Sequence, residues 1–240
     1  MSRTTGWRGS FAAPGWTFST RSVPSRASSA PRATFWLSAA REGDRPLAHI
    51  LEHLTARRSI RRYTDEPVSH DDVQALLEAA MSAPSASNRK PWEFVVVDDA
   101  DRLDRLRRGM VFGRYGAPLA IVVCADMLRC YPPPAQGFWI QDCSAATQNI
   151  LLAATGLGLG SVWLGVHPLA PMIAHVRSVV HLPRHVRPLG VVYIGHPAEE
   201  KPPRTQYDAS RVRWQEYGPA PAVRRWWQFW RREGGGGEGA

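Results

Sequence analysis

The feature that most constrains the fold is an eighteen-residue run, FWIQDCSAATQNILLAAT, at residues 138–155. Apolar side chains fall nearly all the way round a helix of this sequence, so such a helix has little surface that suits water. We therefore predict a long central helix that other elements cover on most sides. The chain has 240 residues, of which 44% are hydrophobic, and this is enough for one sizeable core.

Apolar periodicity places further elements around this helix. Helical spacing predicts one helix from Leu47 and another opened by Ser69, with Asp72 completing a weak capping box. Residues 101–109 are typical of a short charged helix. Buried strands are predicted over 92–98, 119–126, 160–165 and 189–195. Because helices and strands mix without strict βαβ alternation, the pattern favours an α+β or three-layer α/β class.

The positive charge of the chain is concentrated at its two ends. Residues 1–46 carry a net +5 and residues 218–240 a net +2, which leaves +2 of the total +9 for residues 47–217. The middle of the chain therefore gives no reason to expect nucleic-acid binding. We predict three parts: a basic, disordered extension (1–46), one folded domain (47–217) and a tail (218–240).

The two end segments each have more than one interpretation. Residues 1–46 are rich in Arg and Ser and poor in acids, as organelle transit peptides are, but a plain unstructured extension explains them equally. The tail contains RRWWQFWRRE followed by a glycine run. Arg and Trp together suit a membrane surface or a docking partner. A dimer-wrapping arm or a flexible tail explains the same residues.

Several classes of protein are disfavoured. The uncharged stretch 150–176 is interrupted by six Gly and Pro residues, so we predict no membrane-spanning helix. Three cysteines without a C-x-x-C pair predict free thiols and a cytoplasmic setting. His175, His181 and His185 have no acid or Cys close in sequence, and no metal site is predicted. No sequence motif of a catalytic nucleophile is present.

The first candidate binding cluster is Arg57, Arg58, Ser59 and Arg61, at the boundary between a helix and an extended segment. The planar guanidinium matches phosphate oxygens, and the serine hydroxyl adds a short donor. A basic helix end that is stabilised by the helix dipole would look the same. These residues alone leave both possibilities open.

The second candidate is the loop in SAPSASNRKPWEF, residues 82–94. Its polar side chains are Ser85, Ser87, Asn88 and Lys90. A proline on each side stiffens the loop, so little conformational entropy remains to be lost on binding. The loop suits the polar edge of a heteroaromatic ring, although ordinary turn chemistry also explains Pro, Ser and Asn.

The glycine-rich segment GLGLGSVWLG, residues 156–165, does not fit a dinucleotide fingerprint. That fingerprint needs a strand before the glycines and a helix after them, and here the order is reversed. We predict a helix C-cap and a tight turn instead. Leu164 and Gly165, at the end of the following strand, could still face a ligand.

Taken in order, these motifs resemble the nitroreductase family of FMN-dependent NAD(P)H oxidoreductases. The order is RRSIRRY, then APSASNRKPW, then D-x-x-x-A-x-Q-N-x-L-L-A-A-x-x-L-G-L-G-S-x-W-L-G from Asp142, then GHPAEEKPPR. The resemblance covers residues 57–213. It implies a three-layer fold in which helices flank a central mixed, mostly antiparallel sheet, with an extended C-terminal arm.

The resemblance also implies roles for particular residues. Phosphate and ribityl contacts are implied for Arg57, Arg58 and Ser59, and Arg61 would reach the polar edge of the flavin. Ring contacts from the other subunit's loop are implied for Ser85, Ser87, Asn88 and Lys90. Leu164 and Gly165 would lie against the ring, although Val166 departs from the usual pattern. Arg204 would return to the phosphate, with Lys201 as the weaker candidate. No side chain is implied as an obligate catalyst.

The activity implied is ping-pong hydride transfer from NAD(P)H through FMN N5 to a nitroaromatic, a quinone or a similar small acceptor. The implied assembly is a homodimer with FMN at the interface. Aromatic residues between 110 and 140 suit a flat acceptor, although most of them could equally be core. Two alternatives remain: an enzyme of the same fold that performs dehydrogenation, dehalogenation or flavin breakdown, and a non-enzymatic flavin-binding protein.

Overall fold

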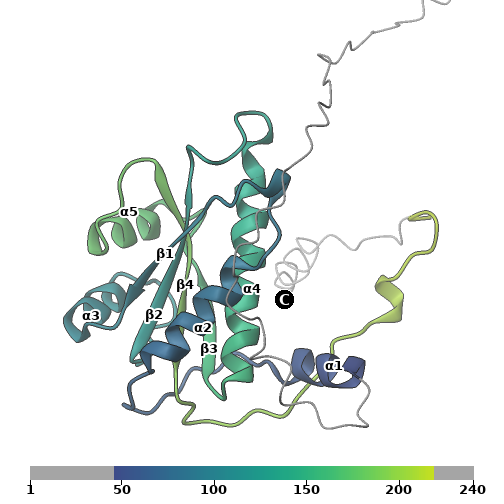
Figure 1. Ribbon diagram of the computed structural model, residues 1–240, viewed down its shortest axis with the longest axis horizontal. Coiled ribbons are helices and arrows are strands. Elements are labelled where there is room, and N and C mark those ends of the chain that lie inside the picture. Colours follow the sequence, from purple (N-terminus) through teal and green to yellow (C-terminus); the bar gives the residue numbers. More distant parts are fainter. Residues whose placement is uncertain (1–45, 219–240) are drawn as a thin grey trace, which may run out of the picture. The chain divides into compact units, whose positions relative to one another are not determined.

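The computed structural model describes the backbone of residues 46–218 and the side chains of residues 50–218. Figure 1 shows the order of the elements. They are α1 (Pro46–Ala56), α2 (His70–Met81), β1 (Trp92–Val97), α3 (Ala100–Arg108), β2 (Leu119–Asp126), α4 (Phe138–Gly156), β3 (Gly160–Gly165), α5 (Ala170–Val179) and β4 (Val186–Gly195). Apart from Pro46 and Gly218, the predicted extension and tail lie outside the described residues.

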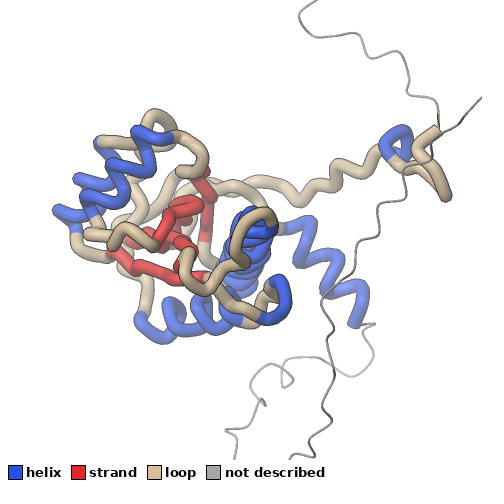
Figure 2. The backbone as a smooth tube through the Cα atoms, turned by 90° about the horizontal axis from the view of Figure 1, so that it is seen from above, coloured by secondary structure: helices blue, strands red, loops and turns tan. Residues whose placement is uncertain are grey.

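The strands form one sheet in the order β1-β2-β4-β3, and each neighbouring pair is antiparallel. In Figure 2 the sheet lies between two groups of helices. Helices α2 and α4 cover one face, and α3 and α5 cover the other. The predicted three-layer α+β fold is therefore confirmed. Within residues 46–218 the parallel component is an isolated bridge between Ser59 and Ser161.

Strand β2 is buried on both faces because it runs through the middle of the sheet. Its side chains alternate between the two layers, as the twofold period of a strand requires. The side chains that face α2 and α4 are Ile121, Val123 and Ala125. Those that face α3 and α5 are Ala120, Val122 and Cys124. This double burial explains the continuous apolar sequence LAIVVCA.

Helix α4 is the central helix that the sequence predicts. It contacts α1, α2 and every strand of the sheet. Its buried side chains are Trp139, Asp142, Cys143, Ala146, Thr147, Ile150, Leu151 and Ala154. The Thr147 hydroxyl donates to the Cys143 carbonyl oxygen at 2.7 Å, so it is paired inside the helix. Burial on several sides leaves α4 as the rigid axis of this layer.

Helix α2 begins as its sequence predicts. The Ser69 hydroxyl oxygen accepts a hydrogen bond from the Asp72 backbone N–H at 3.0 Å, and the hydroxyl donates to the Asp72 carboxylate at 2.7 Å. This side-chain cap satisfies one of the free N–H groups of the first turn. Leu76 and Ala80 are fully buried. The local sequence alone therefore defines both the start and the buried face of α2.

Two features of the second half of the chain differ from the sequence prediction. The sequence does not predict helix α5, because no side chain caps its start at Leu169, although Pro171 in its first turn is typical of a helix start. Strand β4 begins at Val186 rather than at residue 189. The register explains this difference: Val123 pairs with Gly190 but Cys124 pairs with Pro188, so a bulge lies within β4.

The uncharged stretch 150–176 is not one helix. It is divided among the end of α4, the whole of β3 and the first residues of α5. Among the helices of residues 46–218, none is long and apolar enough to cross a bilayer.

Gly158 ends α4 with a left-handed turn, as the sequence predicts. Its φ is +74°. The Leu159 N–H donates to the Ala154 carbonyl at 2.8 Å, and the Gly158 N–H donates to the Thr155 carbonyl at 3.2 Å. These two bonds form a Schellman motif, in which glycine is favoured because it has no Cβ. The turn directs the chain straight into β3.

We expect Gly158→Ala to lower the free energy of unfolding by about 1 kcal/mol, because an alanine is strained at this φ. There is open space around the position, so no steric clash contributes. Gly137 is the matched control, since it also has open space but a right-handed φ of −57°. Urea titration at a fixed protein concentration measures both variants. An equal loss in the two variants would contradict this account of the turn.

Candidate functional site

The segment that follows α1 lies along the start of β3. The Ile60 N–H donates to the Ser161 carbonyl at 3.0 Å, next to the parallel bridge between Ser59 and Ser161. Gly160 permits this close approach, because a Cβ there would lie 2.6 Å from the Ile60 side chain. The position of the predicted arginine cluster is therefore set by backbone contacts with the sheet edge.

The chain that leaves β4 returns to the same place. The Thr64 N–H donates to the His196 carbonyl at 3.0 Å, and the Ala198 N–H donates to the Arg62 carbonyl at 2.9 Å. Further on, the Arg204 N–H donates to the Thr55 carbonyl at 3.2 Å. Residues that are far apart in sequence, around 57–61 and 199–204, are thus brought together at the end of α1.

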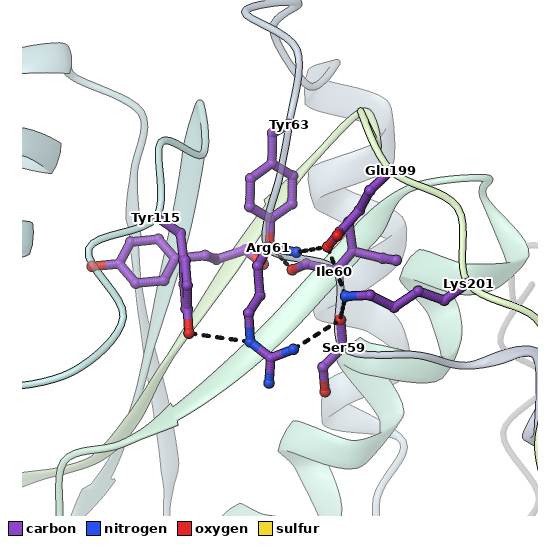
Figure 3. A network of polar contacts seen from close by, with 8 residues as sticks. Ser59, Ile60, Arg61, Tyr63, Tyr115, Glu199 and Lys201 are labelled. Atoms are coloured by element: carbon purple, nitrogen blue, oxygen red, sulfur yellow. Dashed lines mark hydrogen bonds and ion pairs between the residues drawn. The ribbon is translucent and has the colours of Figure 1, made fainter.

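A hollow of about 410 Å³ lies between these two segments and the end of α4. Its lining includes Arg58, Lys201, Thr155 and Gly158. The Lys201 ammonium donates to the Ser59 carbonyl at 2.7 Å and to the Glu199 carboxylate at 2.8 Å (Figure 3). The Arg58 guanidinium donates to the Pro202 carbonyl. Two cations from distant parts of the chain therefore border one hollow.

Glu199 forms hydrogen bonds with both segments. Its carboxylate accepts hydrogen bonds from the Lys201 ammonium at 2.8 Å and from the Arg61 backbone N–H at 2.5 Å. The bond from Lys201, followed by that from Arg61, lowers the pKa of Glu199. The carboxylate is therefore ionised at neutral pH, and its stabilising contribution is lost only as the pH falls through this lowered pKa. The sequence did not single out Glu199, because its bond to the Arg61 backbone joins residues 138 positions apart.

The Arg61 side chain is held from two sides. Its Nε donates to the Tyr115 hydroxyl oxygen at 3.1 Å, and Nη1 donates to the Ser59 carbonyl at 3.4 Å. Figure 3 shows the guanidinium between these two partners. In the backbone next to Arg61, the Ile60 carbonyl accepts a hydrogen bond from the Tyr63 hydroxyl at 2.5 Å. Burial raises the pKa of Tyr63. Arg61 thus lies on a rigid backbone and carries an oriented side chain.

The predicted loop around residues 85–90 has an unusual backbone. Ser87, Asn88 and Lys90 all have positive φ, at 48°, 54° and 50°. Such values are uncommon outside glycine and persist only where the surroundings impose them. Within the loop, the Ser85 hydroxyl oxygen accepts from the Lys90 N–H at 2.9 Å. The Asn88 and Lys90 side chains remain exposed.

Helix α4 supplies the anchor of this loop. Asp142, a buried acid near the start of α4, accepts a hydrogen bond from the Ala86 N–H at 2.8 Å. The Ser87 and Tyr131 hydroxyls form a further hydrogen bond. Asp142 begins one of the family-like motifs, but the sequence does not predict it as a support for the loop. An acid in an otherwise apolar helix is the signal that could have indicated this role.

The loop and the arginine cluster lie at opposite ends of α4 (Figure 1). Asp142 holds the loop, whereas Thr155 borders the hollow at the other end. They are thirteen positions apart, which corresponds to about 20 Å of helix at 1.5 Å per residue. Within one chain, the anchor of the loop and the border of the hollow are therefore well separated.

Leu164 and Gly165 end the strand that starts beside Ser59. From Ser161 to Gly165 the strand covers about 13 Å at 3.3 Å per residue. Leu164 is buried, and Gly165 is exposed opposite Gly190. A Cβ at Gly190 would lie 2.3 Å from the Trp163 indole nitrogen, so this position must remain glycine. The bulge in β4 lies beside these residues, as bulges often do next to functional sites.

Other kinds of chemistry have less support in the structure. Within the described residues, no group of three or more His, Cys, Asp and Glu side chains could hold a metal ion. Cys124, Cys130 and Cys143 are buried free thiols. Burial raises the pKa of Cys124 to about 12 and also raises the pKa of the other two, which disfavours the nucleophilic thiolate.

A larger cleft lies away from the predicted site residues. It has a volume of about 820 Å³ and lies between residues 64–73, helix α3 and the start of β2. Its lining contains no residue of the arginine cluster, the loop or the end of β3. The smaller hollow is therefore the better candidate for a ligand site, because the paired cations converge there.

Comparisons with known proteins agree with this geometry. The nitroreductase family model matches residues 54–111 and 109–196. A protein of Methanothermobacter thermautotrophicus, to which NADH dehydrogenase/NAD(P)H nitroreductase activity is ascribed, is 42% identical over 165 residues, covering 68% of this chain and 85% of that protein. A solved structure from Parabacteroides distasonis with the same ascription is 37% identical, with a TM-score of 0.66, and the match covers 70% of this chain and 99% of that one.

A third relative was solved with a cofactor. It is a protein from Desulfovibrio desulfuricans, ascribed to the nitroreductases and crystallised in complex with FMN. It is 34% identical, with a TM-score of 0.60, and the match covers 74% of this chain and 99% of that one. Both the sequence and the fold lead to one assignment: the chain belongs to the nitroreductase family.

Proposed function

We propose that the chain is an FMN-dependent oxidoreductase, in which the flavin passes hydride from NAD(P)H through N5 to a nitroaromatic, a quinone or a similar small acceptor. The observation that carries this proposal is the meeting of cations from two distant segments at one hollow, beside a strand that ends in an exposed glycine. The Desulfovibrio relative, solved with FMN, supports the same cofactor.

The residues around the hollow fit the phosphate end of FMN. Arg58 and Lys201 border it, while Arg57 and Arg204 flank the end of α1 where the two segments meet. Each charge-assisted hydrogen bond to a phosphate contributes about 1.5–3 kcal/mol. Glu199 and Glu200 also line the hollow. A phosphate therefore binds well only if the positive charges around the hollow outnumber these two negative charges. The lining itself carries two cations and two acids, so Arg57 and Arg204 beside it would supply the excess positive charge.

The strand β3 fits the rest of the cofactor. Ser59 lies beside its start, and Leu164 and Gly165 end it about 13 Å further along. A cofactor that lies along this strand could place its phosphate beside the start of β3 and part of its ring at Gly165. The protein's contribution would be binding and orientation, with Arg61 at the polar edge of the ring, since the flavin itself supplies the redox chemistry.

We also propose a homodimer in which each chain lends its loop to its partner's flavin. The loop residues Ser85, Ser87, Asn88 and Lys90 are anchored at the opposite end of α4 from the arginine cluster of their own chain. In addition, α1 exposes an apolar face, where Ile50, Leu51 and Leu54 are 57%, 54% and 45% exposed. A second chain that packs on this face would cover it and bring the two half-sites together.

The segment after residue 201 supports the same assembly. Residues 202–218 are all exposed, and they include Tyr207, Trp214 and Tyr217. Large exposed aromatics are typical of protein–protein contacts. We propose that this segment is the arm that packs across the partner. The cytoplasmic setting stays a prediction that rests on the pattern of the cysteines.

The proposed activity predicts a yellow protein, or one that becomes yellow with added FMN, whose flavin absorbance is bleached by NADH or NADPH. Double-reciprocal plots at several acceptor concentrations should give parallel lines, because the reduced nucleotide leaves before the acceptor binds. Stopped-flow and steady-state spectrophotometry measure these properties. FMN binding without NAD(P)H oxidation would favour an enzyme of this fold with another chemistry, and absence of FMN binding would overturn the proposal.

Arg58→Ala should weaken FMN binding by about 10- to 150-fold, because it removes one charge-assisted hydrogen bond to the phosphate. Arg102→Ala is the matched control: it removes the same charge from α3, where the side chain is exposed on the other face of the sheet. Fluorescence titration of FMN measures both. Riboflavin, which lacks the phosphate, should bind the wild type and Arg58→Ala with similar affinity. Equal loss in both variants would contradict the phosphate role.

Mixed dimers test whether the loop acts on the partner's site. One chain carries Arg58→Ala, and the other carries Asn88→Asp with Lys90→Gln. Asp tolerates the positive φ at position 88, and Gln removes the charge of Lys90 while keeping an unbranched polar side chain. If loops are exchanged, one site of the mixed dimer combines both defects and the other has none. We therefore expect FMN binding and activity to recover to about half of the wild-type level. No recovery in verified mixed dimers would show that the loop serves its own chain.

A further inference from the structure

Tyr115 occupies a position that the roles proposed so far do not explain. It lies in the connection between α3 and β2, far from Arg61 in sequence. Even so, its hydroxyl oxygen accepts from the Arg61 Nε at 3.1 Å, and the guanidinium carbon lies 6.0 Å from the centre of its ring. Figure 3 shows Tyr115 beside Arg61, on the opposite side from Lys201.

The core fixes the ring of Tyr115. It meets the ring of Tyr193 edge-on, with 6.2 Å between the centroids, and Tyr193 is fully buried in the sheet. Gly113, with a φ of +71°, lets the chain turn tightly here, because a Cβ would lie 2.7 Å from the Tyr115 ring. The Arg107 guanidinium donates to the Ala117 carbonyl and so holds the end of this connection. Tyr115 is therefore a rigid acceptor.

Tyr115 is also close to the proposed ring site. The same Gly113 Cβ would lie 2.8 Å from the side chain of Leu164, which precedes Gly165 at the end of β3. Tyr115 therefore lies near both elements to which ring contacts are assigned, the Arg61 guanidinium and the end of β3. A hydrogen bond from Tyr115 can set the direction of Arg61 with respect to that strand end.

The contacts of Arg61 leave one edge of its guanidinium available. Nε is bonded to Tyr115, Nη1 makes a long contact to the Ser59 carbonyl, and the backbone N–H is bonded to Glu199. Across residues 46–218, Nη2 has no hydrogen-bond partner, and in Figure 3 it points away from both Tyr115 and Ser59. A free arginine side chain loses much rotamer entropy on binding, and a tethered one loses less.

We propose, on the basis of the flavin function proposed above, that Tyr115 is a positioning residue which aims Arg61 at the polar edge of the flavin. A guanidinium held there stabilises the negative charge that gathers on this edge when the flavin is reduced. The hydrogen bond from Arg61 to Tyr115 therefore favours the reduced over the oxidised cofactor. Tyr115 acts through Arg61 and takes no part in the hydride transfer.

The test is Tyr115→Phe, which removes the hydroxyl and keeps the ring that packs on Tyr193. We expect FMN binding to weaken about tenfold more for the reduced cofactor than for the oxidised one. A tenfold difference corresponds to a midpoint potential lower by about 30 mV for a two-electron couple. Anaerobic titration against a reference dye measures the potential, and fluorescence titration measures the affinity of the oxidised cofactor.

Tyr193→Phe is the matched control. Its hydroxyl is buried and has no hydrogen-bond partner among the described residues, so its removal takes nothing from Arg61. We expect an unchanged flavin potential and an unchanged or higher stability in this variant. In the Arg61→Ala background, Tyr115→Phe should have no further effect on the potential, because the guanidinium that it positions is absent.

The outcomes separate this inference from the flavin function itself. A wild type that binds no FMN overturns both. A wild type that binds FMN, with Tyr115→Phe at the wild-type potential, overturns the role of Tyr115 alone. A lower potential in Tyr193→Phe, or an equal shift in the Arg61→Ala background, would mean that Tyr115 acts through general packing, and would also overturn the inference.

Discussion

The site depends on one backbone contact, the docking of residues 59–60 onto the start of β3. The Ile60 N–H bonds to the Ser161 carbonyl, and Gly160 leaves room for the Ile60 side chain. The arginines on either side take their positions from this contact. It holds the segment that carries Arg58 and Arg61 against the sheet, and the bonds of Arg62 and Thr64 to the chain after β4 continue this docking. The chain after β4 then completes the arrangement, since Glu199 and Lys201 bond to the segment that this contact has fixed.

Charge balance is the second constraint on the site. Guanidinium and ammonium groups that converge on a hollow repel one another, and Glu199 reduces this repulsion by pairing with Lys201. The carboxylate also accepts the Arg61 N–H, so it has a structural and an electrostatic role. The same group that holds two segments together therefore limits how strongly the hollow attracts an anion. This balance explains why an acid stands beside cations that are expected to bind a phosphate.

Much of the fold could be predicted from the sequence, because its signals are local. The continuous apolar run of β2, the period of α2 and its Ser69 cap each depend on neighbouring residues. Helix α5 has no such signal, since neither a capping side chain nor charged residues mark its start. The early start of β4 depends on its pairing with β2 across a bulge, and no local pattern specifies that pairing.

Local sequence signals likewise predicted one part of the candidate site and not the other. The arginine cluster and the loop were predicted from their own residue types and from their order along the chain. The bonds from Arg61 to Tyr115 and from Ala86 to Asp142 join residues 54 and 56 positions apart, so they required the fold. The positive φ of Ser87 and Lys90 could not be predicted from the sequence either, because neither residue type favours it. Tertiary contacts impose this backbone against the local preference.

The length of α4 has a consequence for how this family member can change. The helix separates the anchor of the loop from the border of the hollow by about 20 Å. One inserted residue would turn everything beyond it by about 100° and move it by 1.5 Å. Both ends of the helix would then lose their alignment, with each other and with any neighbouring subunit. Insertions and deletions should therefore be tolerated in the surface connections but not in this helix, because its length sets the distance between the loop and the hollow.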